Sequence, residues 1–535
     1  MYSMRQTYFK ATSAKAQKTF FDPDVVLEKR PLRPDSFYVR FRAVCDEVIP
    51  DALFADLYTG FGRPPISPSV LMRLMLLSGR DKCGDEMAME NLLYDERWRY
   101  MCNVPLPECT IHPTTLHYFR LRLLFGTIDR AEIARMKEEG IRLRETPIHR
   151  IFEETKRAGV ALGLLDPEAA QYIDSTYILG AAAVQDTFTL LFQGLRQVVQ
   201  AHGRAVDAEA QEAVLSALRR SEYTTDRKKP DIDWQDEAAR AMLLIDLVQD
   251  AATLLTVCEG MDTPAVCEAM AQMERLVAQD VEVTEDGKAT IRKGVAKDRQ
   301  CSVVDSEMRH GRKSKSKRFN GYKAHVAVEP TSRMVTAIET TEGSLFDGAA
   351  TEAILEQTNP VVMGGDNAYA APEHRAAALL QGTAILTPTA EAKPYDKDNF
   401  ALDEAAGTVT CPAGETATIG KGGKVKFSAK SCGICPFHDE CNPSGKGRTL
   451  TISSHEALQR NLRAAARSGA WAEFLRLRCK IEHTIAHFIR WAGRKGRYFG
   501  KLKTGLQMVF GAIGYNLDRL GHYHVSKMMQ TGLET

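Results

Sequence analysis

Apolar residues recur at helical spacing through most of residues 36–126. The stretch "SPSVLMRLMLLSG" shows the pattern clearly: Ser67 can cap the first turn, Pro68 suits that turn, and Gly79 follows the apolar face. Two more helical stretches, "GDEMAMENLLYDERWRYMC" and "TIHPTTLHYFRLRLLF", follow with Pro and Gly between them. The pattern predicts a small all-α module, either a helix-turn-helix DNA reader or a plain helical bundle.

The period changes near Asp174, where "AQYIDSTYILGAA" is short, β-rich and bounded by small residues, as in a buried strand. Residues 187–300 return to helical spacing. The stretches "GYKAHVAVEP" and "RMVTAIETTE" then alternate around Pro330-Thr331-Ser332, which predicts a β-hairpin. A helix, the strand "VVMGGDNAYA", a second helix and the strand "AILTPTA" follow. This order predicts a mixed α/β sheet covered by helices.

Residues 391–450 are polar, rich in Gly and Lys, and hold four cysteines, whereas residues 454–523 are again helical. We therefore expect six parts in the chain: an extended leader (1–35), a helical N-terminal domain of DNA-binding type (36–150), an α/β core (165–186 and 301–390), a helical insertion (187–300), a cysteine-rich insertion (391–450) and a C-terminal helical region (451–535).

The composition of the 535 residues, with 44% hydrophobic and 26% charged residues, is that of a globular protein with about three or four folding units. The net charge is only +1, so binding to nucleic acid has to come from local basic patches. The start "MYSMRQTYFK" has no apolar signal-peptide core, and no uncharged apolar run reaches the ~20 residues of a membrane helix. We expect a cytoplasmic protein without membrane contact.

Two aspartates follow predicted strands. Asp174 comes after the apolar residues of its strand, and Asp366 follows a β-rich run and two glycines, Gly364 and Gly365. A carboxylate directly after a strand lies at the edge of an α/β sheet, where ligands bind, and glycines allow close approach there. Either aspartate alone could instead be a helix cap or a turn residue.

A third acid, Glu482, is the only carboxylate in "RLRCKIEHTIAHFIRWAGRKGRYFGKLK", which carries nine Lys or Arg residues. Glu482 could be a surface residue paired with Arg478 at i,i+4 spacing. A carboxylate that holds a divalent ion within a DNA-binding surface accounts for the lone acid and for the cations together. His483 and His487 share one helix face, where phosphate or core contacts are the simpler interpretation.

Three carboxylates can hold two Mg²⁺ or Mn²⁺ ions roughly 3.5–4 Å apart, one activating the nucleophile and the other stabilising the leaving oxygen. The sequence thus predicts two-metal chemistry at a phosphodiester, with Asp174, Asp366 and Glu482 as catalytic residues and metal ligands.

A second basic stretch, "RHGRKSKSKRFNGYKAHV", has seven Lys or Arg residues and no acid. It could be a solvated loop, but Phe319 and Tyr322 stand among the cations, which favours contact with a nucleic-acid backbone. The predicted DNA-binding residues of the two basic stretches are Arg312, Lys313, Lys315, Lys317, Arg318, Lys323, Arg478, Arg490, Arg494, Lys495, Arg497, Lys501 and Lys503.

The cysteine-rich part contains Cys411, then Cys432-Gly-Ile-Cys435, then Cys441, which is close to zinc-ribbon spacing. The alternative is four unrelated thiols. We favour a structural Zn²⁺ because the segment has too few apolar residues to make a core of its own.

These motifs together resemble the DDE transposases of the IS1182 type, within the IS4/IS5-like bacterial insertion-sequence group. The resemblance rests on "GRPPISPSVLMRLMLL", "YIDSTYI", "KRFNGYKAHVAVEP", "GGDNAYA", "CPAG" with "CGICPFHDEC", and "RCKIEHTIAHFIRWAGRKGRYFGKLKT" with "AIGYNLDRL". They cover most of the chain in the family's order, which is more specific than any one motif.

The resemblance implies an RNase H-like core with Asp174, Asp366 and Glu482 as its triad. It also implies an enzyme that binds the terminal inverted repeats of an insertion sequence, cuts double-stranded DNA and joins the ends to a target. Cutting two ends together suggests a homodimer, associated with the bacterial nucleoid. Relatives often carry Tyr-x₂-Arg-x₃-Glu-x₆-Lys; here Arg478 and Glu482 match, but Leu475 and Ile489 replace the Tyr and Lys.

Two other functions fit the same residues. An RNase H-like nuclease would cut DNA without joining it, and a non-catalytic DNA-binding protein would retain only the fold. The three acids in their contexts favour an active enzyme over the second alternative.

Overall fold

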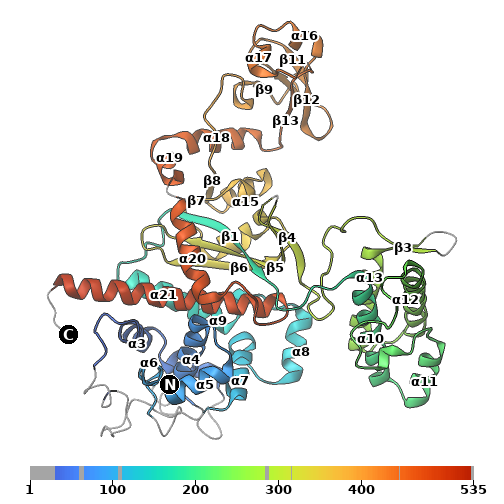
Figure 1. Cartoon of the computed structure of the whole chain (residues 1–535). Coiled ribbons are helices and arrows are strands. Elements are labelled where there is room, and N and C mark those ends of the chain that lie inside the picture. Colours follow the sequence, from blue (N-terminus) through green and yellow to red (C-terminus); the bar gives the residue numbers. More distant parts are fainter. Residues whose placement is uncertain are drawn as a thin grey trace.

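The computed structural model describes residue 24 and residues 31–58, 66–105, 111–283, 288–314, 316–444, 446–476 and 478–531. Most of the expected leader at 1–35, and Lys315 of the second basic stretch, lie outside these residues. Figure 1 shows a central sheet, a group of N-terminal helices beneath it, a helical group on one side and a small module at the far end of the C-terminal helices.

The N-terminal region is helical, as the sequence predicts. In α4 (Pro68–Asp81) the Ser67 hydroxyl accepts from the Val70 amide at 3.3 Å. The helix runs two residues past the predicted end at Gly79 and stops at Lys82, whose backbone is left-handed. The other helices of this region are α3 (Phe37–Val48), α5 (Asp85–Tyr94), α6 (Glu96–Cys102), α7 (Pro113–Phe125), α8 (Arg130–Glu139) and α9 (Pro147–Ala161).

The predicted mixed sheet is present. Its strands lie in the order β4-β5-β1-β7-β8, and β6 pairs with β5 on the side of β4. β5 is antiparallel to β1, while β7 and β8 continue the other side in parallel. The strands are β1 (Gln171–Leu179), β4 (Arg309–Arg312), β5 (Arg318–Val328), β6 (Val335–Glu342), β7 (Val362–Gly364) and β8 (Ala384–Leu386). Helices α14 (Thr351–Thr358) and α15 (Pro372–Leu380) connect β6 to β7 and β7 to β8, in the predicted order.

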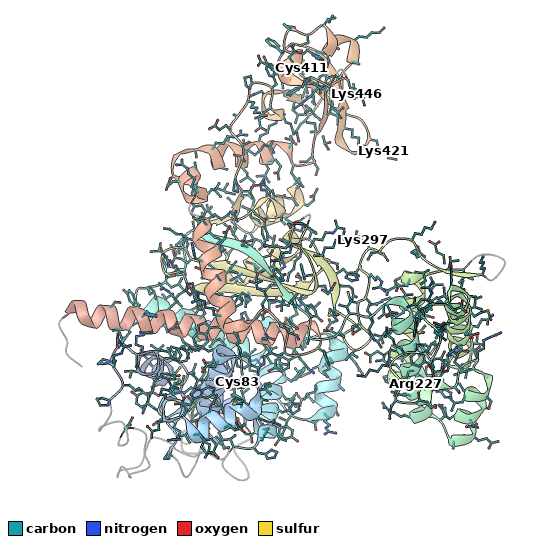
Figure 2. The ribbon with its side chains drawn as sticks, viewed as in Figure 1. Cys83, Arg227, Lys297, Cys411, Lys421 and Lys446 are labelled. Carbon is teal, nitrogen blue, oxygen red and sulfur yellow. The ribbon has the colours of Figure 1, made fainter. Side chains whose placement is uncertain are left out.

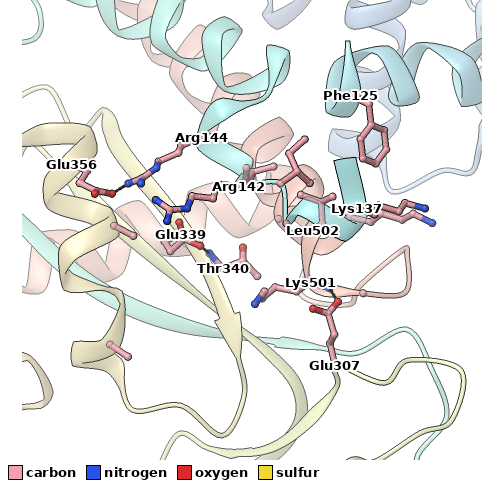
Figure 3. A pocket seen from close by; sticks show the side chains of 18 of the residues that line it. Phe125, Lys137, Arg142, Arg144, Glu307, Glu339, Thr340, Glu356, Lys501 and Leu502 are labelled. Atoms are coloured by element: carbon pink, nitrogen blue, oxygen red, sulfur yellow. Dashed lines mark hydrogen bonds and ion pairs between the residues drawn. The ribbon is translucent and has the colours of Figure 1, made fainter. Parts of the chain in front are cut away.

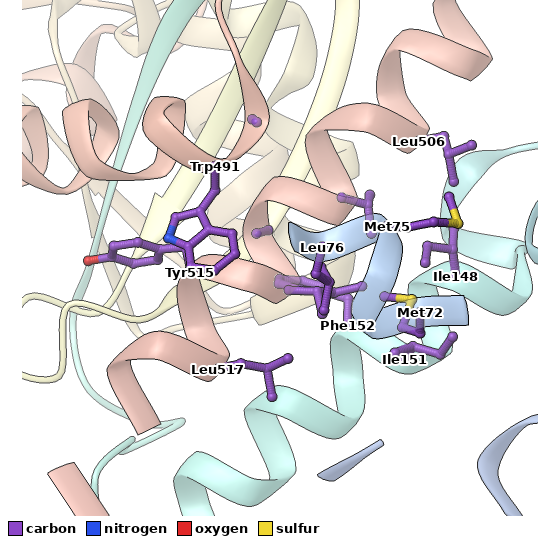
Figure 4. Packing of buried hydrophobic residues seen from close by; sticks show 14 of the residues in the cluster. Met72, Met75, Leu76, Ile148, Ile151, Phe152, Trp491, Leu506, Tyr515 and Leu517 are labelled. Atoms are coloured by element: carbon purple, nitrogen blue, oxygen red, sulfur yellow. The ribbon is translucent and has the colours of Figure 1, made fainter. Parts of the chain in front are cut away.

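The C-terminal region contains α18 (Glu456–Arg467), α19 (Gly469–Arg476), α20 (Cys479–Ala492) and α21 (Lys501–Thr531). One continuous core joins this region to the N-terminal helices and to one face of the sheet. Figure 4 shows Leu76 of α4, Phe152 of α9 and Trp491 of α20 within it. The Trp491 ring stacks on Phe41 of α3 at 5.2 Å. The two ends of the chain therefore fold onto each other. No described helix combines the length and apolar character needed to cross a membrane.

The residues between β1 and β4 form a helical group with its own hydrophobic core (Figure 1). Its two ends meet, because the Gln185 amide donates to the Cys301 carbonyl at 2.9 Å and Arg299 pairs with the buried Asp280. The elements are α10 (Thr187–Ala205), α11 (Ala208–Ala217), α12 (Glu237–Val257), α13 (Pro264–Asp280), β2 (Val281–Val283) and β3 (Ala289–Ile291).

The cysteine-rich segment has a hydrophobic core, contrary to the sequence-based expectation. Six buried residues in or directly beside the short strands make it: Phe400, Val409, Val425, Phe427, Leu450 and Ile452. These residues are scattered over about fifty positions, so no single stretch looks apolar. The elements are β9 (Ala401–Asp403), β10 (Thr408–Thr410), β11 (Thr416–Thr418), β12 (Lys424–Lys426), β13 (Thr449–Thr451), α16 (Ala429–Gly433) and α17 (His438–Cys441).

Candidate active site

Asp174 lies in the middle of the sheet, on the central strand β1, and its residue is only 8% exposed. Its Oδ1 accepts from the Ser175 amide at 2.7 Å. Burial raises the pKa of Asp174; Lys313 and Arg478 oppose this shift, and the carboxylate of Asp366 adds to it. A largely desolvated acid is thus held close to a second acid and to two cations.

Asp366 follows the short strand β7, which is parallel to β1 with Tyr172 opposite Gly364. Continuing this register by two residues places Asp366 beside Asp174. The Asp366 side chain accepts from the Ala368 amide at 2.9 Å and so caps a short 3₁₀ turn (Asn367–Tyr369). The structure therefore brings these two predicted site residues together.

Gly364 is required here by side-chain packing. A Cβ atom at this position would lie 2.7 Å from Cε1 of Phe474 and 2.9 Å from Cδ1 of Tyr172. The rings of Tyr172 and Phe474 stack at 4.3 Å, and the Tyr172 hydroxyl donates to the Phe474 carbonyl. The glycine lets the segment before α20 lie directly over β1 and β7.

Glu482 is exposed on α20, one turn after Arg478. Arg478 does not pair with it; its guanidinium lies 3.8 Å from Oδ2 of Asp174. The surface ion pair between Arg478 and Glu482, considered as an alternative from the sequence, is therefore not formed within the described part of the chain. Arg478, at the start of the helix that carries Glu482, thus reaches Asp174, and Glu482 is one turn further along the helix.

Sequence reasoning missed a buried polar network beside the aspartates. Asp347 accepts from the Ser175 hydroxyl at 2.6 Å and from Lys323 at 2.7 Å. The fully buried His325 interacts through Nδ1 with the Tyr369 hydroxyl at 3.1 Å, and through Nε2 with the Thr341 hydroxyl at 2.8 Å. Burial lowers the pKa of His325 to about 4. Ser175 follows Asp174 directly, and Tyr369 ends the short 3₁₀ turn that Asp366 caps, so the network holds the backbone near both aspartates.

The second basic stretch only partly matches its prediction. Phe319 and Tyr322 are buried, so the argument from aromatic rings among the cations is wrong. β5 is covered on both faces, and the Tyr322 hydroxyl bonds to Asp305. A different ring is presented: Tyr177 lies under Lys317 at 4.8 Å and Arg494 at 4.4 Å.

The predicted DNA-binding cations fall into two groups. Some have partners within the protein: Lys323 pairs with Asp347, Lys313 donates to the Ser175 carbonyl, and Arg497 donates to Cys83. The exposed group is Arg312, Lys313, Lys317, Arg318, Arg490, Lys495, Arg497 and Lys503. Lys313 and Arg497 belong to both groups, because each donates a hydrogen bond within the protein and is still exposed to solvent.

The four predicted zinc ligands, Cys411, Cys432, Cys435 and Cys441, line one cavity of about 310 Å³. Burial raises the pKa of Cys441, and the other three thiols add to the shift. Figure 2 shows Cys411 in this outer module, together with Lys421 and Lys446. Among the described residues, no three Asp, Glu, His or Cys side chains stand close enough to form a ready-made metal site, either here or at the aspartates.

Comparison with protein families gives two matches. A transposase domain (DUF772) model matches residues 26–122, and a transposase DDE domain model matches residues 410–521. The first covers helices α3 to α6 and most of α7, and the second covers most of the cysteine-rich module, Glu482 and most of α21. No curated protein and no solved structure matches the chain.

Both matching models describe transposase domains, so the two matches support a DDE transposase family and indicate a transposase.

Proposed function

We propose that this protein is an insertion-sequence transposase of the IS1182 type, which binds terminal inverted repeats, cuts the DNA ends and transfers them to a target. The observation that carries the proposal is the placement of Asp174 beside Asp366 on adjacent parallel strands, with Arg478 reaching Asp174 from the helix of Glu482. The order of the sheet, with a hairpin on one side of β1 and parallel strands on the other, supports an RNase H-like core.

In this proposal Asp174, Asp366 and Glu482 hold two Mg²⁺ or Mn²⁺ ions. The donor set fits: two adjacent carboxylates repel each other, and burial penalises the charge of one of them, so a divalent cation at this point relieves both costs. When bound, the ions activate the attacking water or 3′-hydroxyl and stabilise the leaving oxygen.

The protein's own residues supply position and charge. Arg478 and Lys313 favour the ionised form of the Asp174 carboxylate, because both oppose the rise in its pKa that burial causes. The Asp347–Ser175 and His325–Tyr369 contacts fix the backbone that carries the two aspartates. The exposed cations near Tyr177 and at the end of α20 bind DNA phosphates, and these contacts position the duplex without reading its sequence. Glu482 closes the site from α20 when DNA and metal are present.

Two further parts belong to the same proposal. The four thiols around one cavity suit a structural Zn²⁺, which would hold α16 and α17 to the strands. A homodimer that holds both ends of the element, at the nucleoid of a bacterial cell, completes the picture.

The test uses linear DNA that carries the inverted repeats found on either side of the gene. Asp174→Asn, Asp366→Asn and Glu482→Gln should each abolish Mg²⁺-dependent cleavage, while Asp262→Asn and Glu259→Gln, on exposed loops of the helical insertion, should not. Full cleavage by any of the first three variants would remove that residue from the site. Strand transfer with pre-cut ends separates a transposase from a nuclease that only cuts.

A further inference from the structure

A hollow of about 760 Å³ lies where the α4–α5 corner meets the connection between α20 and α21. Its walls come from parts of the chain about 400 residues apart. Five cations line it and no carboxylate does: Lys82, Arg120, Arg494, Lys495 and Arg497.

Four of these cations have no carboxylate partner among the described residues, whereas Arg120 pairs with Asp85. Lys82 donates to the carbonyls of Gly79 at 3.0 Å and Trp491 at 3.2 Å. Arg497 donates to the Cys83 carbonyl at 2.7 Å, and Arg494 donates to the Thr176 hydroxyl at 3.1 Å. The remaining cation, Lys495, has no side-chain hydrogen bond within the described part of the chain. Backbone carbonyls position Lys82 and Arg497, and the nearby Asp81 partly compensates the charge of Lys82. No described carboxylate lines the hollow itself.

A second hollow of similar size contains carboxylates as well as cations, and it serves as a comparison. It holds about 730 Å³ between α8, β6, α14 and the start of α21 (Figure 3). Two of its cations face glutamates: Arg144 pairs with Glu356, and the charges of Arg144 and Lys501 both act on Glu339. The hollow lined by cations alone is therefore not a general property of the interfaces in this fold.

Burial lowers the pKa of Lys82 to about 8, and the positive charge of Arg497 contributes to this shift. A lysine with a lowered pKa is one whose charge is poorly compensated. An anion in the hollow would raise the pKa of Lys82 again, because it would attract all four cations at once.

We propose that this hollow binds a backbone phosphate of duplex DNA, so that the N-terminal helices and the α20–α21 connection clamp one strand together. The assignment rests on the proposed function and adds to it Lys82, a residue from the N-terminal region.

Continuity with the candidate active site favours DNA over a free anion. Arg494 lines the hollow and also bonds to Thr176 and to the Tyr177 carbonyl, on the strand that carries Asp174. The backbone at Lys495 bridges to Leu179, five residues along that strand. Five strand residues span roughly 17 Å, which is about five base steps at 3.4 Å each. One DNA backbone can therefore reach from the aspartates to the hollow.

The test measures binding of the full chain to a fluorescent duplex of arbitrary sequence, without divalent ions, across a range of salt concentrations. Lys495→Gln is the main variant because its side chain makes no described contact. It should weaken binding several-fold and reduce the slope of log K against log salt by about 0.9, the value for one phosphate contact. Lys82→Gln should act alike, with thermal unfolding used to verify its fold. Lys228→Gln, the same charge change on the exposed insertion, should leave both quantities unchanged.

The outcomes separate the two proposals. If the wild type binds DNA but Lys82→Gln and Lys495→Gln keep its slope, the hollow does not hold phosphate and the proposed function stands. A second outcome is that pyrophosphate raises the melting temperature of the wild type but not of the two variants, while the variants bind DNA as tightly as the wild type. The hollow then binds a free anion, and its assignment to a DNA phosphate is wrong. If the wild type does not bind duplex even at low salt, the proposed function fails first.

Discussion

Gly364→Ala tests the packing that brings the two aspartates together. The new Cβ would stand 2.7 Å from the Phe474 ring, whereas ordinary contacts begin at 3.4 Å, so a shift of about 0.7 Å is needed. Phe474 cannot yield easily, because Tyr172 stacks on one side of it and Trp471 packs edge-on at 5.8 Å. Overpacking of this kind costs about 1–3 kcal/mol.

The effect on activity should exceed the effect on stability. If β7 moves away from β1 to relieve the contact, Asp366 moves with it, and a displacement near 1 Å in an active site can cost on the order of 100-fold in rate. We expect Gly364→Ala to unfold at lower urea concentration, with an unchanged m-value, and to cleave DNA at a rate well below that expected from the folded fraction.

The control is Gly433→Ala, in α16, where a Cβ meets nothing within 4 Å. It should leave stability and cleavage near those of the wild type, since Ala is the better helix former. The double variant Gly364→Ala/Phe474→Leu should lose less stability than the two single changes predict together, because the ring that causes the clash is gone. Additive losses in that cycle, or wild-type unfolding of Gly364→Ala, would refute the packing argument.

Two further predictions concern the buried His325 and the four thiols of the cysteine-rich module. The pKa of His325 is about 4 in the folded chain and near 6.5 when unfolded, so its contribution to stability is present above pH 6.5 and is lost as the pH falls toward 4. The free energy of unfolding then falls by about 3 kcal/mol. In urea unfolding, the free energy of His325→Gln should fall less steeply between pH 6.5 and pH 4 than that of the wild type. An equally steep fall in both proteins would exclude His325 as the source. Metal analysis should find about one Zn²⁺ per chain, and Cys435→Ser should reduce it; a clearly lower content in the purified wild type would contradict the four-thiol site.

The sequence predicts the order of strands and helices along the chain well, because that order depends on local patterns, and the hairpin has a clear turn. Asp366 follows its strand as expected, but Asp174 does not: β1 continues through Ser175 to Leu179, so Asp174 lies within the central strand and not after its end. The adjacency of Asp174 and Asp366 follows once β1 and β7 pair in parallel. These features require only the short-range alternation of residues and one rule about sheets.

Other features depend on tertiary contacts that no pattern encodes. Asp347 and His325 join the network near the aspartates only because β5, β6 and η5 (Asp347–Ala350) fold over β1. Phe319 and Tyr322 looked like surface rings among cations, but both are buried: Phe319 packs against Tyr177, and the Tyr322 hydroxyl bonds to Asp305. Lys82 gave no signal at all, since its neighbours in the hollow lie about 400 residues away.

The meeting of the two ends of the helical insertion has a consequence for how the chain folds. β1 and β5 are paired neighbours, yet 138 residues separate Leu179 from Arg318. If the insertion folds first and its ends join at Gln185 and Cys301, the open loop shrinks to 23 residues. The entropic cost of closing the loop then falls by about 1.6 kcal/mol. An insertion that folds first would therefore speed assembly of the central sheet, although it lies apart from the aspartates.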